Sequence, residues 1–229
     1  MPRIKYETAA GDGLEQTRFC VSAQPCPFLA NAFAELVLRF GRERCELLLN
    51  EAQTRQVVED VGNYVSDLGV LCFRRGGECG LRECVRQYGL EFHQLFTLAP
   101  RILLWREHPL AGCESVTFQA LRPYPMVCFG EEGGRSPDPV EELFACGAVD
   151  KRITLGDRAA LLPLMSGLGG YALSTDGFPQ SLLDDSLVSV PLAEEETMCV
   201  GYVLNPGQEL SRLEELFIGI LMRRSAAGD

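Results

Sequence analysis

The stretch Arg152–Ser174, RITLGDRAALLPLMSGLGGYALS, decides the fold class. It begins with a short apolar strand at 153–155, and Asp157 then occupies the position of a helix N-cap. Apolar residues recur at helical spacing over 160–168, which predicts a helix with one buried face. Gly169 and Gly170 suit a left-handed helix end and a close backbone approach before a second strand begins.

A β-α-β unit of this length requires a parallel sheet, whose strands are buried on both faces. Ligands of such sheets lie at the carboxyl ends of the strands, where loops and helix N-termini present free backbone N–H groups. The stretch therefore predicts an α/β protein with a crevice for a small molecule.

The rest of the chain continues this alternation of strands and helices. Two further β-α-β units are expected before residue 74, with strands at 17–22, 46–50 and 68–73 and helices at 28–40 and about 54–61. The strand at 46–50, ELLLN, is apolar enough to predict that neither face is exposed. Later strands are expected at 90–95, 101–105, 125–129, 187–192 and 198–204, with short helices within 74–88 and at 116–121 and a final amphipathic helix at 210–221.

The charge balance argues against nucleic-acid binding by this chain. It has 32 acidic and 21 basic residues, a net charge of −11, whereas phosphate contacts need a clustered basic face. No apolar run reaches the roughly 18–20 residues that span a bilayer. Residues 1–16 form a polar leader that we expect to be poorly ordered and that lacks the apolar core of a signal peptide. These features predict a cytoplasmic protein.

Neither the cysteines nor the histidines form a recognisable chemical motif. The ten cysteines include no C-x-x-C pair, and those in apolar strands, such as Cys72 and Cys128, are expected to be small core side chains. His93 and His108 lack metal-ligand spacing, and His108 is expected to make structural hydrogen bonds. No nucleophile elbow, P-loop or dinucleotide fingerprint is present. We therefore expect no catalytic residue, no metal and no cofactor.

From about Thr17 to Met222, the order of these segments resembles the effector-binding domain of LysR-type transcriptional regulators. The most specific match is Arg101–Ala111, an apolar strand followed by His-Pro-Leu-Ala. The other matches are an acidic strand end before a helix at Leu47–Glu51, an aspartate-led strand at Asp67–Val70, and a capped helix with a Gly-Leu-Gly turn at Asp157–Leu173.

The resemblance implies a two-lobed, periplasmic-binding-protein-like (type 2) fold. Each lobe would be a mostly parallel sheet flanked by helices, with an effector in the cleft between them. Crossing segments are expected near Glu91–Leu95 and Pro191–Glu196, so that lobe I comprises 17–92 plus 195–229 and lobe II comprises 93–194. Family members also carry an N-terminal helix-turn-helix, whereas only sixteen residues precede the first expected strand. Whether that segment was removed or is naturally absent, we expect no DNA binding by this chain alone.

The implied function is a ligand-sensing regulatory domain that couples effector binding to the geometry of a homodimer or tetramer. The helices at Phe28–Phe40 and Val57–Val61 have apolar faces that suit either the subunit contact or core packing. The effector class that the family implies is a small carboxylate or an aromatic acid. Two alternatives remain on the same fold, namely an enzyme that converts a small molecule and a solute-binding protein.

Candidate ligand-binding residues follow the strands of the predicted sheets. They are Ser22, Ala23, Gln24, Gln53 and Thr54 in one lobe, and Phe129, Gly130, Glu131 and Gly169 in the other. The resemblance implies that a hydroxyl after each of the first two strands holds an effector carboxylate, and Ser22 and Thr54 match those positions.

Each of these assignments has a structural alternative. Ser22 also fits a strand-end hydroxyl and Thr54 a helix N-cap. Glu131 is either a solvated loop charge or a group that repels anions and selects an amine-bearing ligand.

Overall fold

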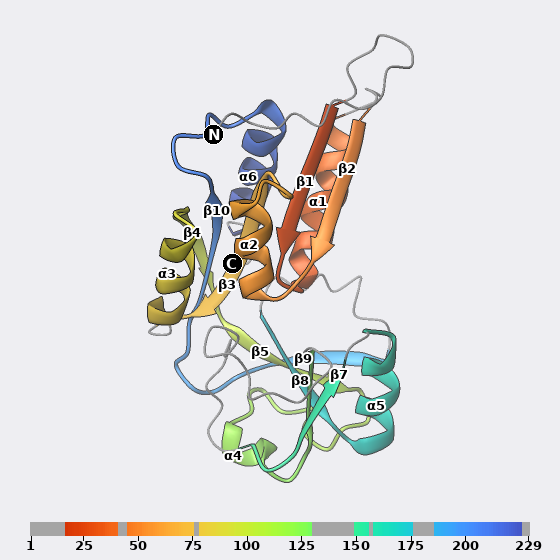
Figure 1. Ribbon diagram of the computed structural model, residues 1–229. Coiled ribbons are helices and arrows are strands. Elements are labelled where there is room, and N and C mark those ends of the chain that lie inside the picture. Colours follow the sequence, from red (N-terminus) through yellow and green to blue (C-terminus); the bar gives the residue numbers. More distant parts are fainter. Residues whose placement is uncertain are drawn as a thin grey trace.

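The computed structural model describes residues 17–40, 45–75, 78–129, 149–155, 158–175 and 186–225. They form two lobes, each built on a five-stranded sheet (Figure 1). The strand order is β2-β1-β3-β10-β4 in the first sheet and β7-β6-β8-β5-β9 in the second. In each sheet four strands run in one direction and one strand, β10 or β5, runs against them. This is the mostly parallel, two-lobed α/β architecture that the sequence predicted.

The first lobe is a sheet covered by helices on both faces. Its elements are β1 (Thr17–Ala23), α1 (Pro27–Phe40), β2 (Cys45–Glu51), α2 (Thr54–Gly62), β3 (Leu68–Arg74), α3 (Glu78–Gln87), β4 (Glu91–Leu98), β10 (Met198–Leu204) and α6 (Arg212–Ser225). On one face, α1 and α6 bury a cluster that includes Phe19, Leu36 and Phe217. On the other face, Val57 and Leu71 belong to a separate cluster beneath α2 and α3.

The second lobe has the same layered arrangement. Its elements are β5 (Pro100–Trp105), α4 (Phe118–Leu121), β6 (Met126–Phe129), β7 (Arg152–Leu155), a 3-10 turn (Arg158–Ala160), α5 (Leu161–Leu168), β8 (Tyr171–Thr175) and β9 (Leu187–Pro191). Ile102, Leu104 and Leu121 pack together on the face that bears α4. Leu103 and Met165 pack on the face that bears α5.

The stretch Arg152–Ser174 forms the predicted strand, helix and strand, with β6 lying between β7 and β8 in the sheet. Gly169 has φ 60° at the end of α5, and a Cβ at Gly170 would lie 3.0 Å from the Pro125 carbonyl oxygen. Both glycines therefore have the roles that the sequence predicted. Leu168 does not belong to the buried stripe, since it is half-exposed. The expected cap, Asp157, lies outside the described residues.

The burial predicted for the strand at 46–50 is wrong. Among the described residues β2 is an edge strand that pairs with β1 alone, and its three leucines are partly exposed. An apolar run therefore indicated a strand but not its place in the sheet, because an edge strand has a neighbour on one side only.

The first crossing lies at residue 99, between β4 and β5, and not at Glu91–Leu95 as expected. Those residues are part of β4, which pairs with β10, so that 93–98 lie in the first sheet. The second crossing, between Pro191 and Met198, is near its expected position. A chain that crosses enters each sheet at the edge where the parallel strands end, which explains why β5 and β10 run against them.

Tyr64, just after α2, has an unusual backbone conformation. Its φ is 59°, in the left-handed region, and the N–H of Val65 bonds to the Asp60 carbonyl oxygen across this turn. Glycine normally occupies this position at a helix end because it has no Cβ to clash with the carbonyl oxygen. The Tyr64 side chain is 51% exposed, so little packing compensates for the strain.

Replacing Tyr64 with Gly is expected to raise the free energy of unfolding by about 1 kcal/mol, because the left-handed strain is relieved. Urea denaturation followed by circular dichroism measures this change. The matched control is Asn63→Gly, at φ −92°, where glycine only adds entropy to the unfolded chain and should lower stability. An equal decrease in the free energy of unfolding in the two variants would contradict the assignment of strain to Tyr64.

His108 joins the His-Pro-Leu-Ala turn to the end of α5. Its buried ring accepts a hydrogen bond at Nδ1 from the Leu110 N–H (3.1 Å), so the proton of the neutral ring is on Nε2, which donates to the Gly169 carbonyl oxygen (3.2 Å). Burial lowers the pKa of His108, and the bond to Gly169 only partly opposes this effect. The folded protein therefore favours the neutral ring of His108. The expectation that His108 makes structural hydrogen bonds is confirmed.

The lowered pKa of His108 gives stability a definite pH dependence. Above the ordinary histidine pKa of about 6.5, the contribution of the neutral His108 ring to the free energy of unfolding is fully present. It is lost as the pH falls from there towards the lowered pKa, because the unfolded chain then binds a proton that the folded chain does not. We expect the urea midpoint to fall between about pH 7 and pH 5, and His108→Gln to flatten that dependence. His93→Gln, at an exposed position of β4, is the control and should keep the wild-type slope. An unchanged slope in His108→Gln would contradict the assignment.

Candidate functional site

The carboxyl ends of the parallel strands face each other where the two lobes meet. In the first lobe β1, β2 and β3 end at Ala23, Glu51 and Arg74, on the side of the sheet from which the chain crosses. In the second lobe β6 ends at Phe129 and β8 ends at Thr175, which pairs with Pro100 just beyond the first crossing. Figure 1 shows both sets of ends directed towards the junction between the lobes.

Gln24 links three elements at this edge. Its side-chain nitrogen donates to Thr54 Oγ1 at the start of α2 (2.5 Å), and its side-chain oxygen accepts from the Cys72 N–H on β3 (2.5 Å). Gln24 and Thr54 are both buried. The predicted residues Gln24 and Thr54 are therefore in direct contact, and their bond fixes the start of α2 against the ends of β1 and β3.

Gln53, not Thr54, is the N-cap residue of α2, and its side chain makes no capping bond. The first backbone bond of the helix runs from the Val57 N–H to the Gln53 carbonyl oxygen. The amide groups of residues 54–56 form the first turn of α2, at the positive end of the helix dipole. Gln53 is partly exposed beside them, whereas Ala23 is fully buried and contributes its carbonyl oxygen to the Ala52 N–H.

Ser22 lies beneath α2. Its fully buried hydroxyl donates to Asp60 Oδ2 (2.6 Å) and lies 2.8 Å from the hydroxyl of Ser66. The same Asp60 carboxylate accepts from Asn50 (3.1 Å) and from Gln56 (2.7 Å). The structure thus places Ser22 in a polar network below the helix, apart from the Gln24–Thr54 contact at the edge.

The sequence reasoning missed Asp60. The signal was present, because Asp60 lies three positions after Val57, on the helix face that carries the buried valines. A carboxylate at an inward-facing helical position needs several hydrogen-bond donors. The neighbouring thiol of Cys20, 3.3 Å from the Ser66 hydroxyl, has its pKa raised chiefly by burial and stays protonated.

The prediction that Gly169 faces the first lobe is not supported by the topology. Gly169 precedes the amino end of β8, beside Pro125 at the amino end of the parallel strand β6, whereas the first lobe lies at the carboxyl ends. Its N–H also bonds to the Met165 carbonyl oxygen as part of the helix end. Phe129 ends β6 at the edge towards the first lobe, and Gly130 and Glu131 lie outside the described residues.

Two absences can be stated for the described part of the chain. No group of three or more His, Cys, Asp or Glu residues there is arranged to hold a metal ion. None of the helices described is long and apolar enough to cross a membrane.

Solved structures share this fold. The oxidised form of OxyR aligns with a TM-score of 0.62 and 18% identity, covering 92% of this chain and 97% of that one. HinK, a LysR family transcriptional regulator from Pseudomonas aeruginosa, aligns with a TM-score of 0.63 and 17% identity, and the alignment covers 92% of this chain and 71% of that one. A Corynebacterium glutamicum OxyR variant aligns with a TM-score of 0.65 and 15% identity, and the alignment covers 93% of this chain and 66% of that one. At these identities the likeness concerns the fold alone.

The sequence comparison is more specific than the fold. The chain matches no curated protein. The model of the LysR substrate binding domain, however, matches residues 15–226, nearly the whole length. The chain therefore belongs to the LysR substrate-binding domain family, the ligand-sensing regulatory domain of LysR-type transcriptional regulators.

Proposed function

We propose that the chain binds a small carboxylate effector between its lobes, against the N-terminus of α2. The observation that carries this proposal is the position of that helix. Its first turn, which carries the partial positive charge of the helix dipole, starts at the edge where the lobes meet. The Gln24–Thr54 contact fixes this turn in place, so that little rearrangement is needed when a ligand binds.

The remaining residues of the proposed site have different tasks. Gln53 is the partly exposed N-cap residue of α2, next to Thr54 at the positive end of the helix dipole. Ser22 and Ala23 support this surface from below, since both are fully buried. In the second lobe, Phe129 ends β6, Gly130 and Glu131 come next in the chain, and we propose that these three residues contact the other side of the ligand. A carboxylate at Glu131 favours a ligand that also carries an amine.

The proposed role is sensing and not conversion, with no cofactor. Two contacts between the end of β3 and the second crossing would couple ligand binding to the arrangement of the lobes. Arg74, at the end of β3, forms an ion pair with Glu196 in the second crossing (3.2 Å), and the Arg75 N–H bonds to the Thr197 carbonyl oxygen.

We further propose that the protein acts in the cytoplasm and that this acidic chain, with its net charge of −11, does not bind DNA alone.

Gln53→Glu is expected to weaken the binding of a carboxylate effector about tenfold, because it places a second negative charge beside the helix N-terminus. A thermal-shift screen of small carboxylates, amino acids and aromatic acids identifies the ligand, since binding to the folded state raises Tm. Calorimetric titration then gives Kd for both proteins.

Gln119→Glu, at an exposed position on α4, is the matched control and should leave Kd unchanged. The proposal is wrong if no compound raises Tm, or if the two variants behave alike. Mass spectrometry of the recovered ligand tests the sensing role, because an enzyme would return a changed mass.

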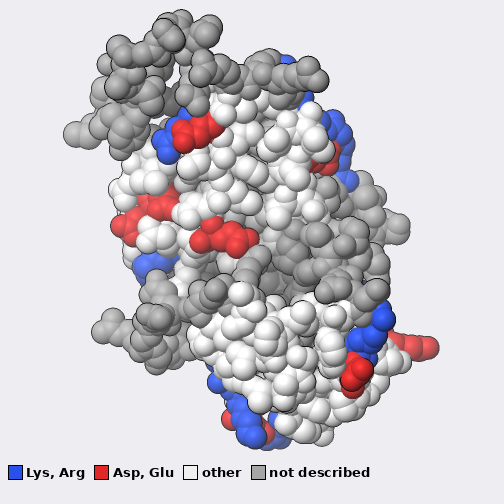
Figure 2. All heavy atoms as spheres, turned by 90° about the vertical axis from the view of Figure 1, so that its right-hand side faces the viewer, with Lys and Arg blue, Asp and Glu red and all other residues white. Residues whose placement is uncertain are grey.

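We also propose that two copies associate through the exposed side of α1. Val57, Val58 and Val61 are fully buried, so the stripe on α2 is explained by core packing. On α1, by contrast, Leu38 is 82% exposed next to the exposed Val37. Figure 2 views the side of the molecule that carries α1, β2 and α5, where the surface of the described residues is mostly uncharged. Such a surface suits the core of a subunit interface.

Leu38→Glu is expected to weaken self-association by about 2 kcal/mol, because a charge would be buried in the interface. Sedimentation equilibrium measures the dimer dissociation constant. Val65→Glu is the control, since Val65 is an exposed apolar residue after α2, on the opposite face of the sheet. If the wild-type chain is a 25 kDa monomer at micromolar concentration, the interface does not exist.

A further inference from the structure

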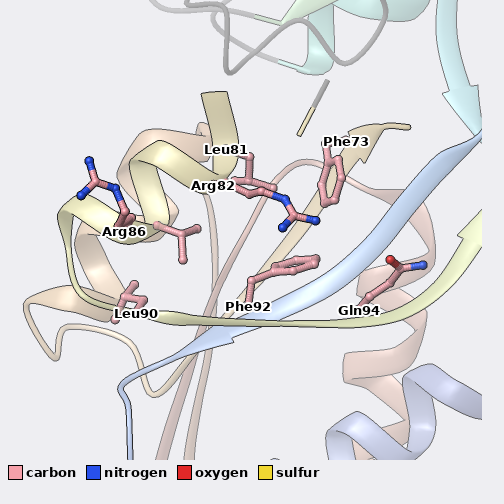
Figure 3. A pocket seen from close by; sticks show the side chains of 8 residues that line it. Phe73, Leu81, Arg82, Arg86, Leu90, Phe92 and Gln94 are labelled. Carbon is pink, nitrogen blue, oxygen red and sulfur yellow. The ribbon is translucent and has the colours of Figure 1, made fainter. Parts of the chain in front are cut away.

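A pocket lies on the outer side of the first lobe, between α3, the end of β3 and β4. Its volume is about 190 Å³. Its apolar lining consists of the side chains of Phe73, Leu81, Val85, Leu90 and Phe92, and its polar lining of Arg82, Arg86 and Gln94. Figure 3 shows these side chains converging from the helix and from the two strands.

The aromatic wall of the pocket is well defined. Phe73 and Phe92 meet edge to face, with ring centroids 5.4 Å apart and an interplanar angle of 65°. Phe73 and Leu81 are buried, whereas Phe92 is partly exposed at the pocket. A cavity of roughly 150 Å³ already accommodates a benzene-sized molecule, so this space fits one ring or a short alkyl chain but not a peptide helix.

Two arginines on α3 flank the pocket, and they differ in their partners. Arg86 is held by Glu83 one turn earlier, with N–O distances of 2.8 to 3.0 Å, and Figure 3 shows it directed away from the pocket. Arg82 is directed towards the rings of Phe73 and Phe92. No carboxylate among the described side chains forms an ion pair with it. The pocket therefore has a cationic guanidinium at its mouth and an apolar interior.

We propose that this pocket is a second small-molecule site, for a monocarboxylate with one ring or a short alkyl chain. The apolar part of the ligand fills the space beside Phe92, and its carboxylate pairs with Arg82, whose planar guanidinium matches a carboxylate with two parallel hydrogen bonds. The site is built from α3, the end of β3 and β4, and does not use Gln24, Gln53 or Thr54. It therefore does not depend on the effector site proposed between the lobes.

The position of the pocket gives an occupant access to both crossings. β4, which carries Phe92, leads directly into the first crossing at residue 99. Phe73 precedes Arg74, which holds Glu196 in the second crossing. A ligand that packs against both phenylalanines thus contacts β4, which leads into the first crossing, and β3, whose end is paired with the second crossing.

Isotope-labelled protein titrated with cyclohexanecarboxylate and followed by amide NMR tests the proposal. We expect saturable shifts at the amides of 81–90 and 92–94. The carboxamide of the same ring, which has the same shape without the charge, should bind about tenfold more weakly. Arg82→Gln should weaken carboxylate binding about tenfold, whereas Arg86→Gln, one turn along the same exposed helix face, should leave it unchanged.

Three results would overturn the proposal. The first is the absence of saturable shifts up to about 20 mM, a generous limit for a fragment of this size. The second is a set of shifts confined to Gln24, Gln53 and Thr54, which would support the site between the lobes and exclude the α3–β4 pocket. The third is an equal effect of Arg82→Gln and Arg86→Gln, because binding would then not involve a specific pair with Arg82.

Discussion

The first lobe depends on the buried carboxylate of Asp60. It accepts hydrogen bonds from Ser22 on β1, Asn50 on β2 and Gln56 on α2 itself, and through Ser22 it reaches Ser66 before β3. A buried charge is stable only when several donors surround it, so these elements must meet in one arrangement. Asp60 lies on the same helix face as the buried valines, so its network and their packing together fix which face of α2 is turned to the sheet.

The polar contacts above and below α2 have separate roles. The Asp60 network holds the helix from below, and the Gln24–Thr54 contact fixes its first turn at the edge facing the second lobe. Together the two contacts hold the start of α2 at that edge. A residue that looks like a ligand contact in the sequence, such as Ser22, can therefore serve the site by positioning the helix.

The crossings explain the topology and connect the two proposed sites. Because the chain leaves each sheet at the edge where its parallel strands end, β5 and β10 must run against their neighbours. The same edge carries the start of α2, the Arg74–Glu196 ion pair and the direct continuation of β4 into β5. The α3–β4 pocket lies on the outer side of the first lobe but shares β3 and β4 with this junction. Both sites consequently touch the elements that set the arrangement of the lobes.

The sequence by itself determined the order and type of the elements, since apolar periodicity, the glycines at 169 and 170 and the His-Pro-Leu-Ala turn are local signals. It also indicated Gln24 and Thr54, because residues that follow parallel strands meet at one edge. Only the tertiary structure decided that β2 is an edge strand, that Ser22 bonds to Asp60, that Gly169 lies at the far edge, and that Arg82 faces two phenylalanines. The physical reason is that strand order, helix rotation and side-chain direction depend on contacts between residues far apart in the chain, which no local pattern records.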